Sequence, residues 1–172
     1  MENMQHQQHT VLRTVIAGII GLFGFLIVNR IGFGVADPIL FDPNLQSPKL
    51  IAVWNEIKPL PPAHGLVATL SILVLIGIGR AFVYRWLARF WPSGFAARAI
   101  RYWLLVWFLS YFFVEFSAPF TLFGEPAGLI LIEMVILGVA VMTEAFVVAG
   151  IMETSKALAA KGQSTRLGWK RL

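Results

Sequence analysis

Long apolar runs with few polar interruptions dominate the residue pattern of this chain. One of them, LILIEMVILGVAVMTEAFVV at 129–148, holds only two charged residues, Glu133 and Glu144. A transmembrane helix needs about 20 mostly apolar residues to cross a hydrocarbon layer of about 30 Å. This run is therefore long enough to span a membrane.

Four segments meet the same length requirement, and they lie at about 11–30, 62–83, 100–122 and 126–152. Each must be helical, because lipid offers no partner for backbone N–H and C=O groups outside a helix or a closed barrel. We therefore predict an all-α polytopic membrane protein. Its four transmembrane helices would form an up-down bundle in a single domain covering 1–172.

Basic residues predict how the bundle is oriented. Five arginines and no acid lie at 80–101, between the second and third spans, and five Lys or Arg residues lie in the tail at 153–172. Because cytoplasmic loops carry an excess of Lys and Arg, both segments should be cytoplasmic. Both termini would then be inside the cell, and 31–61 would be an outer loop whose only helical part is 49–57. We expect a multi-pass protein of the cell (inner) membrane.

Composition supports the membrane class and limits the chemistry. The chain is 58% hydrophobic and 13% charged, whereas soluble domains carry roughly a quarter of their residues as Asp, Glu, Lys and Arg. It contains no cysteine, which excludes disulfides, thiolate metal sites and cysteine redox chemistry. The net charge of +5 is better explained by membrane anchoring and orientation than by nucleic-acid binding.

Arginines alternate with aromatic residues in YRWLARFWPSGFAARAIRYW at 84–103. Such a pattern can stack on single-stranded nucleic acid, but beside two membrane spans it is typical of an aromatic belt with arginines on anionic headgroups. We therefore expect a lipid bilayer with anionic headgroups as partner, and no nucleic acid. The expected headgroup contacts are Arg85, Trp86, Arg89, Trp91, Arg98 and Arg101.

Carboxylates inside the spans are the first functional candidates. Glu133 and Glu144 are eleven residues apart, which places them on one helix face about 16 Å apart. A carboxylate facing lipid costs at least ~2.5 kcal/mol, so this face should point into the bundle or into water. Glu115 lies only about 20 Å along its helix from Arg101, too short a distance to reach the outer surface. Pro119 follows it, and we expect a kink or break there.

Matching depths along the helices predict two polar layers. Glu144 should pair with Arg80 in an inner layer, and Glu115 and Glu133 should share an outer layer with Arg30, Asn29 and His64. The layers could be ion pairs and hydrogen bonds that fix helix register, or they could pass protons or cations. A path would need a polar group between the layers, such as Thr69, Ser71, Ser110, Tyr111 or Thr143.

Small residues predict close helix packing. Ala17, Gly21 and Gly24 share a face of the first span, and Ala145 and Ala149 share a face of the fourth. Small residues at such spacing let helix backbones approach each other. We expect this packing inside the bundle.

Signatures of catalysis are missing from the sequence. The chain has no pair of histidines placed for haem, no Glu-x-x-His pair for a di-iron bundle and no phosphate-binding glycine loop. We predict no cofactor and no metal site, and we do not favour an enzyme. The leading hypothesis is a non-enzymatic subunit or assembly module of a larger membrane complex, with a membrane-protein partner or self-association. The alternatives are a small proton- or cation-coupled transporter or channel that uses the intramembrane glutamates, and a membrane enzyme acting on lipid or quinone.

Overall fold

The described part of the protein consists of helices joined by turns, and it contains no strand. The computed structural model describes the backbone of residues 2–56 and 62–168, and the side chains of residues 8–52 and 65–154. Within these residues, four helices are long and apolar enough to cross a membrane, at Gln8–Leu40, Gly65–Leu87, Phe95–Phe120 and Ala127–Thr154. The predicted all-α architecture with four spans is confirmed.

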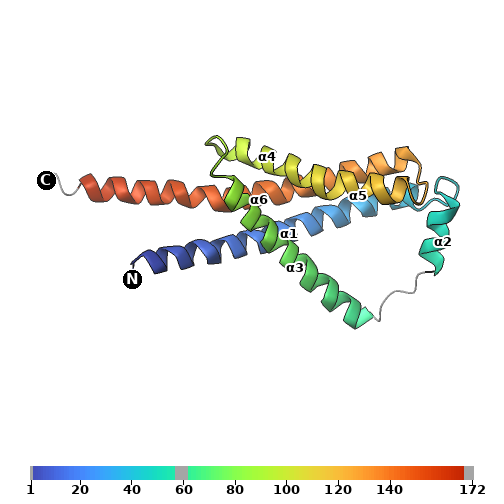
Figure 1. The fold of residues 1–172 in the computed structure, drawn as a ribbon, viewed down its shortest axis with the longest axis horizontal. Coiled ribbons are helices and arrows are strands. Elements are labelled where there is room, and N and C mark those ends of the chain that lie inside the picture. Colours follow the sequence, from blue (N-terminus) through green and yellow to red (C-terminus); the bar gives the residue numbers. More distant parts are fainter. Residues whose placement is uncertain (1, 57–61, 169–172) are drawn as a thin grey trace.

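The spans alternate in direction along the chain (Figure 1). The elements are α1 (Glu2–Leu40), α2 (Pro48–Glu56), α3 (Pro62–Leu87), α4 (Phe95–Trp107), η1 (Phe108–Phe112), α5 (Phe113–Glu115), η2 (Phe116–Phe120) and α6 (Ala127–Gly168). Together α4, η1, α5 and η2 make one continuous span. We call the end of the bundle with the α3–α4 turn the arginine end, and the end with Glu115, Glu125 and Glu133 the acidic end. Which side of the membrane each end faces stays a prediction.

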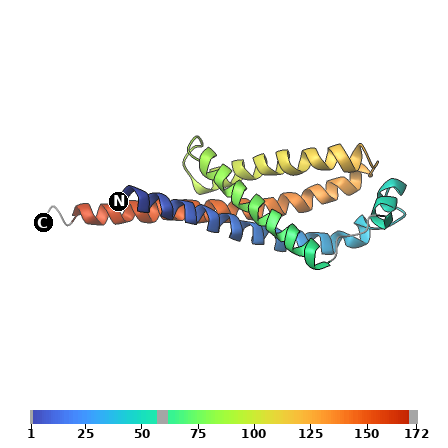
Figure 2. The same cartoon turned by 60° about the horizontal axis from the view of Figure 1, so that its bottom comes forward.

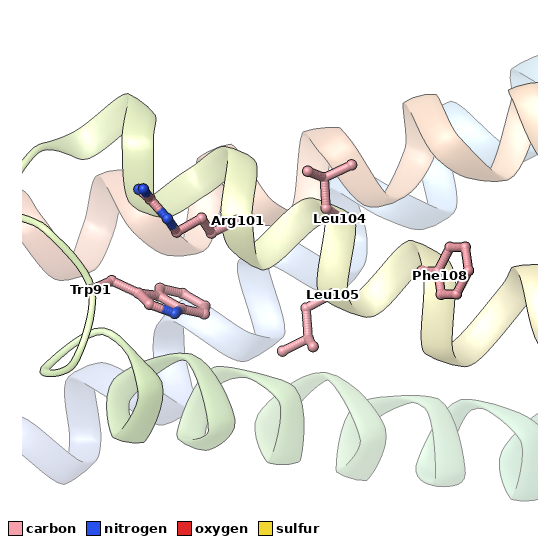
Figure 3. A pocket seen from close by; sticks show the side chains of 5 residues that line it. All are labelled: Trp91, Arg101, Leu104, Leu105 and Phe108. Carbon is pink, nitrogen blue, oxygen red and sulfur yellow. The ribbon is translucent and has the colours of Figure 1, made fainter.

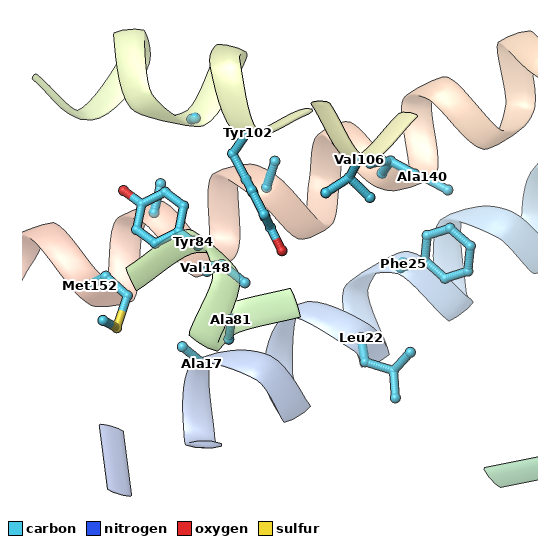
Figure 4. Packing of buried hydrophobic residues seen from close by; sticks show 14 of the residues in the cluster. Ala17, Leu22, Phe25, Ala81, Tyr84, Tyr102, Val106, Ala140, Val148 and Met152 are labelled. Carbon is cyan, nitrogen blue, oxygen red and sulfur yellow. The ribbon is translucent and has the colours of Figure 1, made fainter. Parts of the chain in front are cut away.

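Helix α6 is the centre of the bundle. It packs along α1 on one side and along α4 on another, while α3 crosses α1 obliquely (Figures 1 and 2). The core cluster lies where these helices meet, and it includes Tyr84 and Tyr102 (Figure 4). The predicted small residues Ala17, Ala145 and Ala149 are all fully buried there, so the expected close packing within the bundle is confirmed.

The crossing of α1 and α3 depends on two glycines. A Cβ atom added at Gly18 would lie 2.7 Å from the carbonyl oxygen of Gly77, and one added at Gly77 would lie 2.9 Å from the carbonyl oxygen of Gly18. Real Cβ atoms essentially never come this close to backbone. The two helix backbones are therefore in direct contact at this point.

Helix α1 is longer than the sequence pattern indicated. Residues 31–40, which we assigned to the outer loop, form its last turns. They are helical because Ala36 and Leu40 are buried against Leu129 of α6 in a second apolar cluster. Pro38 lies in the final turn of the helix and has no N–H to donate to the carbonyl oxygen of Gly34, so the helix continues there with one backbone hydrogen bond fewer. Helix α6 continues to Gly168, through most of the predicted basic tail.

The third span is irregular at Pro119, where we expected a kink or break. The helix runs through this proline as the π-helical turn η2, and an earlier π-helical turn, η1, precedes it. A π-helix bonds each N–H to the carbonyl five residues earlier, so the hydrogen-bond ladder is already shifted around the residue that has no N–H. The span then ends in a turn in which Glu125 N donates to Pro119 O.

Candidate functional site

A charged pair lies in the middle of the bundle, far from both ends. Glu144 and Arg80 each lie about 5–6 Å from the midpoints of their spans, Ala127–Thr154 and Gly65–Leu87, toward the arginine end. The Glu144 side chain is 1% exposed, and its Oε2 atom is 3.0 Å from Arg80 Nη1. The pair predicted from matching depth is therefore formed.

Two tyrosines complete what we call the midplane cluster, formed by Arg80, Tyr102, Tyr111 and Glu144. Arg80 Nη2 donates to the Tyr111 hydroxyl at 3.2 Å. Tyr111 belongs to η1 and stacks on Phe25 of α1. Tyr102 points from α4 into the core between α3 and α6 (Figure 4), where Arg80 and Glu144 are its electrostatic neighbours.

Two oxygen atoms of the midplane cluster do not take part in its hydrogen bonds. Among the described residues, Tyr102 Oη and Glu144 Oε1 are buried and have no hydrogen-bond partner. A buried polar atom without a partner costs about 1–3 kcal/mol. The cluster is therefore a polar site of high cost within the apolar core around it.

Arg98 has a structural role that the sequence did not indicate. We expected it at lipid headgroups, but its Nη1 atom lies 2.7 Å from Glu153 Oε2, and it donates to the carbonyl oxygens of Trp91 and Pro92. The other carboxylate oxygen of Glu153 accepts from the Tyr84 hydroxyl at 3.4 Å. The forked guanidinium suits this position because the α3–α4 turn leaves carbonyl groups without helical partners.

The remaining predicted headgroup residues lie at the surface of the arginine end. Arg89 and Trp86 are exposed, and the Arg89 guanidinium lies over the Trp86 ring at 5.6 Å from its centroid. Arg101 is exposed, whereas Arg85 and Trp91 are half-buried. Their contact with lipid stays a prediction.

Three carboxyl groups gather at the acidic end. Glu115 and Glu133 are close enough to influence each other electrostatically, and Glu125 is near enough to affect both. Glu125 is buried and accepts from Gln46 Nε2 at 3.1 Å, which ties the segment after α1 to the start of α6.

The predicted outer layer forms only in part. The structure brings Glu115 and Glu133 together, but Arg30 is exposed and makes no ion pair with them within the described residues. Asn29 Oδ1 is buried without a partner there, and the His64 side chain lies outside the described residues. The acidic end therefore lacks the arginine that we expected for it.

Several site residues were missed from the sequence. Tyr102, Glu153 and Tyr84 were not singled out, and Tyr111 was only one of five candidates for joining the layers. The signal that could have found Tyr102 and Tyr111 is the depth argument that paired Arg80 with Glu144, because phenol groups at the same depth are natural hydrogen-bond partners. Gln46 had no such signal, since it lies in a loop.

The fold and the midplane cluster together define a small multi-pass helical membrane protein with a polar group buried at mid-depth. Among the described residues, no group of three or more His, Asp or Glu side chains could hold a metal ion. Comparisons with protein-family models, curated proteins and solved structures give no match for this chain. The function is therefore argued from the site alone.

Proposed function

We propose that the protein is a subunit or assembly module of a larger membrane complex, and that the first half of α3 is the helix that docks to the partner. The observation that carries this proposal is that the first half of α3 is exposed on every side of the helix. All residues at 66–72 are exposed, and they cover nearly two full turns. Figure 1 shows this part of α3 diverging from the other spans.

The side chains on this half-helix favour a partner helix over lipid. Ala68, Thr69 and Ser71 are exposed there among leucines and valines. In membranes, small residues allow close backbone approach, and Ser and Thr hydroxyls form hydrogen bonds between helices. A surface that meets only acyl chains gains nothing from either feature. The proposed occupant is a transmembrane helix of a different membrane protein.

Site-directed cross-linking in native membranes tests this proposal. Because the chain has no cysteine, Ala68→Cys introduces a single thiol. With a short thiol-reactive photo-cross-linker, we expect Ala68→Cys and Ser71→Cys to give one discrete product with another membrane protein. The measurement is the mass and identity of the cross-linked species.

Val135→Cys is the matched control, because Val135 is also exposed but lies on α6. It should give lipid adducts without the discrete product. A product made only of two copies of this chain would replace the proposed partner by self-association. If position 68 reacts no differently from position 135, the docking role of α3 is rejected.

A second candidate function, proton or cation transfer, is supported by the position of Tyr111. Tyr111 bonds to Arg80 of the midplane cluster, and Glu115 of the acidic end is an electrostatic neighbour of the same tyrosine. Tyr111 thus lies between the two layers, where the sequence required an intervening polar group. A path would run from Glu133 through Glu115 and Tyr111 to Glu144.

Reconstitution into liposomes with an enclosed pH-sensitive dye separates the two functions. A proton path predicts flux that is lost in both Glu133→Gln and Tyr111→Phe and retained in Arg89→Gln, which changes an exposed residue outside the path. If the protein only assembles with a partner, liposomes that contain it should show no more proton flux than empty vesicles under a pH gradient or a membrane potential. We expect no flux from the isolated chain.

A further inference from the structure

A groove on the surface of α4 combines one basic residue with an apolar floor. Arg101, Leu104, Leu105 and Phe108 line it together with Trp91, and its volume is about 420 Å³. This is within the range of roughly 300–1,000 Å³ that is usual for small-molecule sites. The groove is formed by side chains of α4 and η1 and by Trp91 of the α3–α4 turn (Figure 3).

The lining residues form one continuous stripe. Three lining residues come from α4 and a fourth, Phe108, is the first residue of η1. They are spaced at i, i+3, i+4 and i+7, so they share one face of the continuous helix over about 10 Å. Figure 3 shows Trp91 and Arg101 at one end of the stripe and Phe108 at the other. The charged end lies at the arginine end of the bundle, and the apolar end points toward the middle of the membrane.

Arg101 is available for an anion. It is exposed, and its one hydrogen bond among the described residues goes from Nη1 to the carbonyl oxygen of Ala97, within its own helix. The remaining guanidinium N–H groups can donate to a phosphate in the forked arrangement that arginine favours. Trp91 is held beside it because Arg98 donates to the Trp91 carbonyl oxygen and is anchored on Glu153.

We propose that this groove binds one anionic phospholipid, with its phosphate on Arg101 and an acyl chain along Leu104, Leu105 and Phe108. The groove matches such a lipid in both charge and depth, because it runs from a guanidinium at the membrane interface along apolar side chains toward the bilayer centre. A helix is a poorer occupant, because bulky leucine and phenylalanine side chains, rather than small ones, form the floor. This inference does not depend on the proposed function.

Native mass spectrometry of the full chain, purified and delipidated in mild detergent, tests the proposal. Titration with dioleoyl phosphatidylglycerol should give one tightly bound lipid per chain, and dioleoyl phosphatidylcholine should bind at least fivefold more weakly. Arg101→Gln should weaken phosphatidylglycerol binding about five- to tenfold, because one arginine at an anionic surface contributes about 1 kcal/mol. Leu104→Trp should also weaken binding, by filling the groove while leaving the charge in place.

Arg89→Gln is the matched control, because Arg89 is also exposed at the arginine end but lies over Trp86 and Phe90, outside the groove. It should leave phosphatidylglycerol affinity unchanged. Equal binding of the two lipids, or equal effects of the two arginine variants, would overturn the site. Inorganic phosphate should compete only weakly. If it competes as well as the lipid, the site binds the anion alone and the acyl-chain groove is rejected.

Discussion

Replacing Glu144 by glutamine should lower the free energy of unfolding by about 3–5 kcal/mol, the range for breaking a buried ion pair by removing one partner. The loss is large because Arg80 would keep its charge near the membrane midplane without a counter-ion. Its remaining hydrogen bond, to Tyr111, does not neutralise the charge. Equilibrium unfolding in detergent micelles, followed by circular dichroism, measures the effect.

The double variant Arg80→Gln/Glu144→Gln supplies the decisive comparison. Removing both charges should restore part of the lost stability, giving a coupling energy of at least ~1 kcal/mol. Arg89→Gln, an exposed substitution without a buried partner, should stay within about 0.5 kcal/mol of the parent protein. Strictly additive losses for Arg80 and Glu144 would show that the two side chains do not stabilise each other.

Gly18→Leu should cost about 3 kcal/mol or more, the second largest effect we expect. Any side chain at this position meets the backbone of α3, with the Gly77 carbonyl oxygen and the Ile78 Cα each 2.7 Å from the added Cβ. Overpacking costs about 1–3 kcal/mol where side chains can move aside, and here no flexible side chain can. The α1–α3 crossing would have to open, which also disturbs Arg80 one turn along α3. Thermal unfolding in the same detergent measures the loss.

Gly34→Ala is the control for Gly18, because a Cβ at Gly34 meets nothing within 4 Å although it lies on the same helix. Alanine has a better helix propensity than glycine, so this variant should be neutral or up to about 1 kcal/mol more stable. If Gly18→Leu is tolerated as well as Gly34→Ala, the two backbones are not in contact and the oblique crossing of α3 is wrong.

The sequence predicted those features that follow from length and depth. Hydrocarbon thickness sets the length of each span, and the cost of an isolated charge in lipid requires a partner at the same depth. Together these constraints gave the four helices and the pairing of Glu144 with Arg80 from residue numbers alone. The small-residue face at Ala17 was predicted for a similar reason, since close packing leaves a periodic signature along one helix.

Features that depend on how two helices cross could not be predicted in this way. Gly18 and Gly77 are unremarkable in their own segments, and only the angle between α1 and α3 brings them together. The same holds for Arg98, whose position in a run of arginines and aromatics indicated headgroups until the turn at 91–94 brought it to Glu153. At the acidic end, equal depth placed Glu115 and Glu133 correctly but gave no information on which helix face Arg30 occupies.

The position of α6 at the centre of the bundle has a consequence for biosynthesis. Chains emerge from the ribosome N-terminus first. Helices α1, α3 and α4 therefore enter the membrane before α6, against which α1 and α4 pack. Until Glu144 is inserted, Arg80 has no counter-charge, and α1 and α4 have no common surface to join them. Before the last span arrives, the α1–α3 crossing is the main contact available to these helices, so assembly is completed only with α6, and a chain cut short before α6 would keep Arg80 inside its span without a counter-charge.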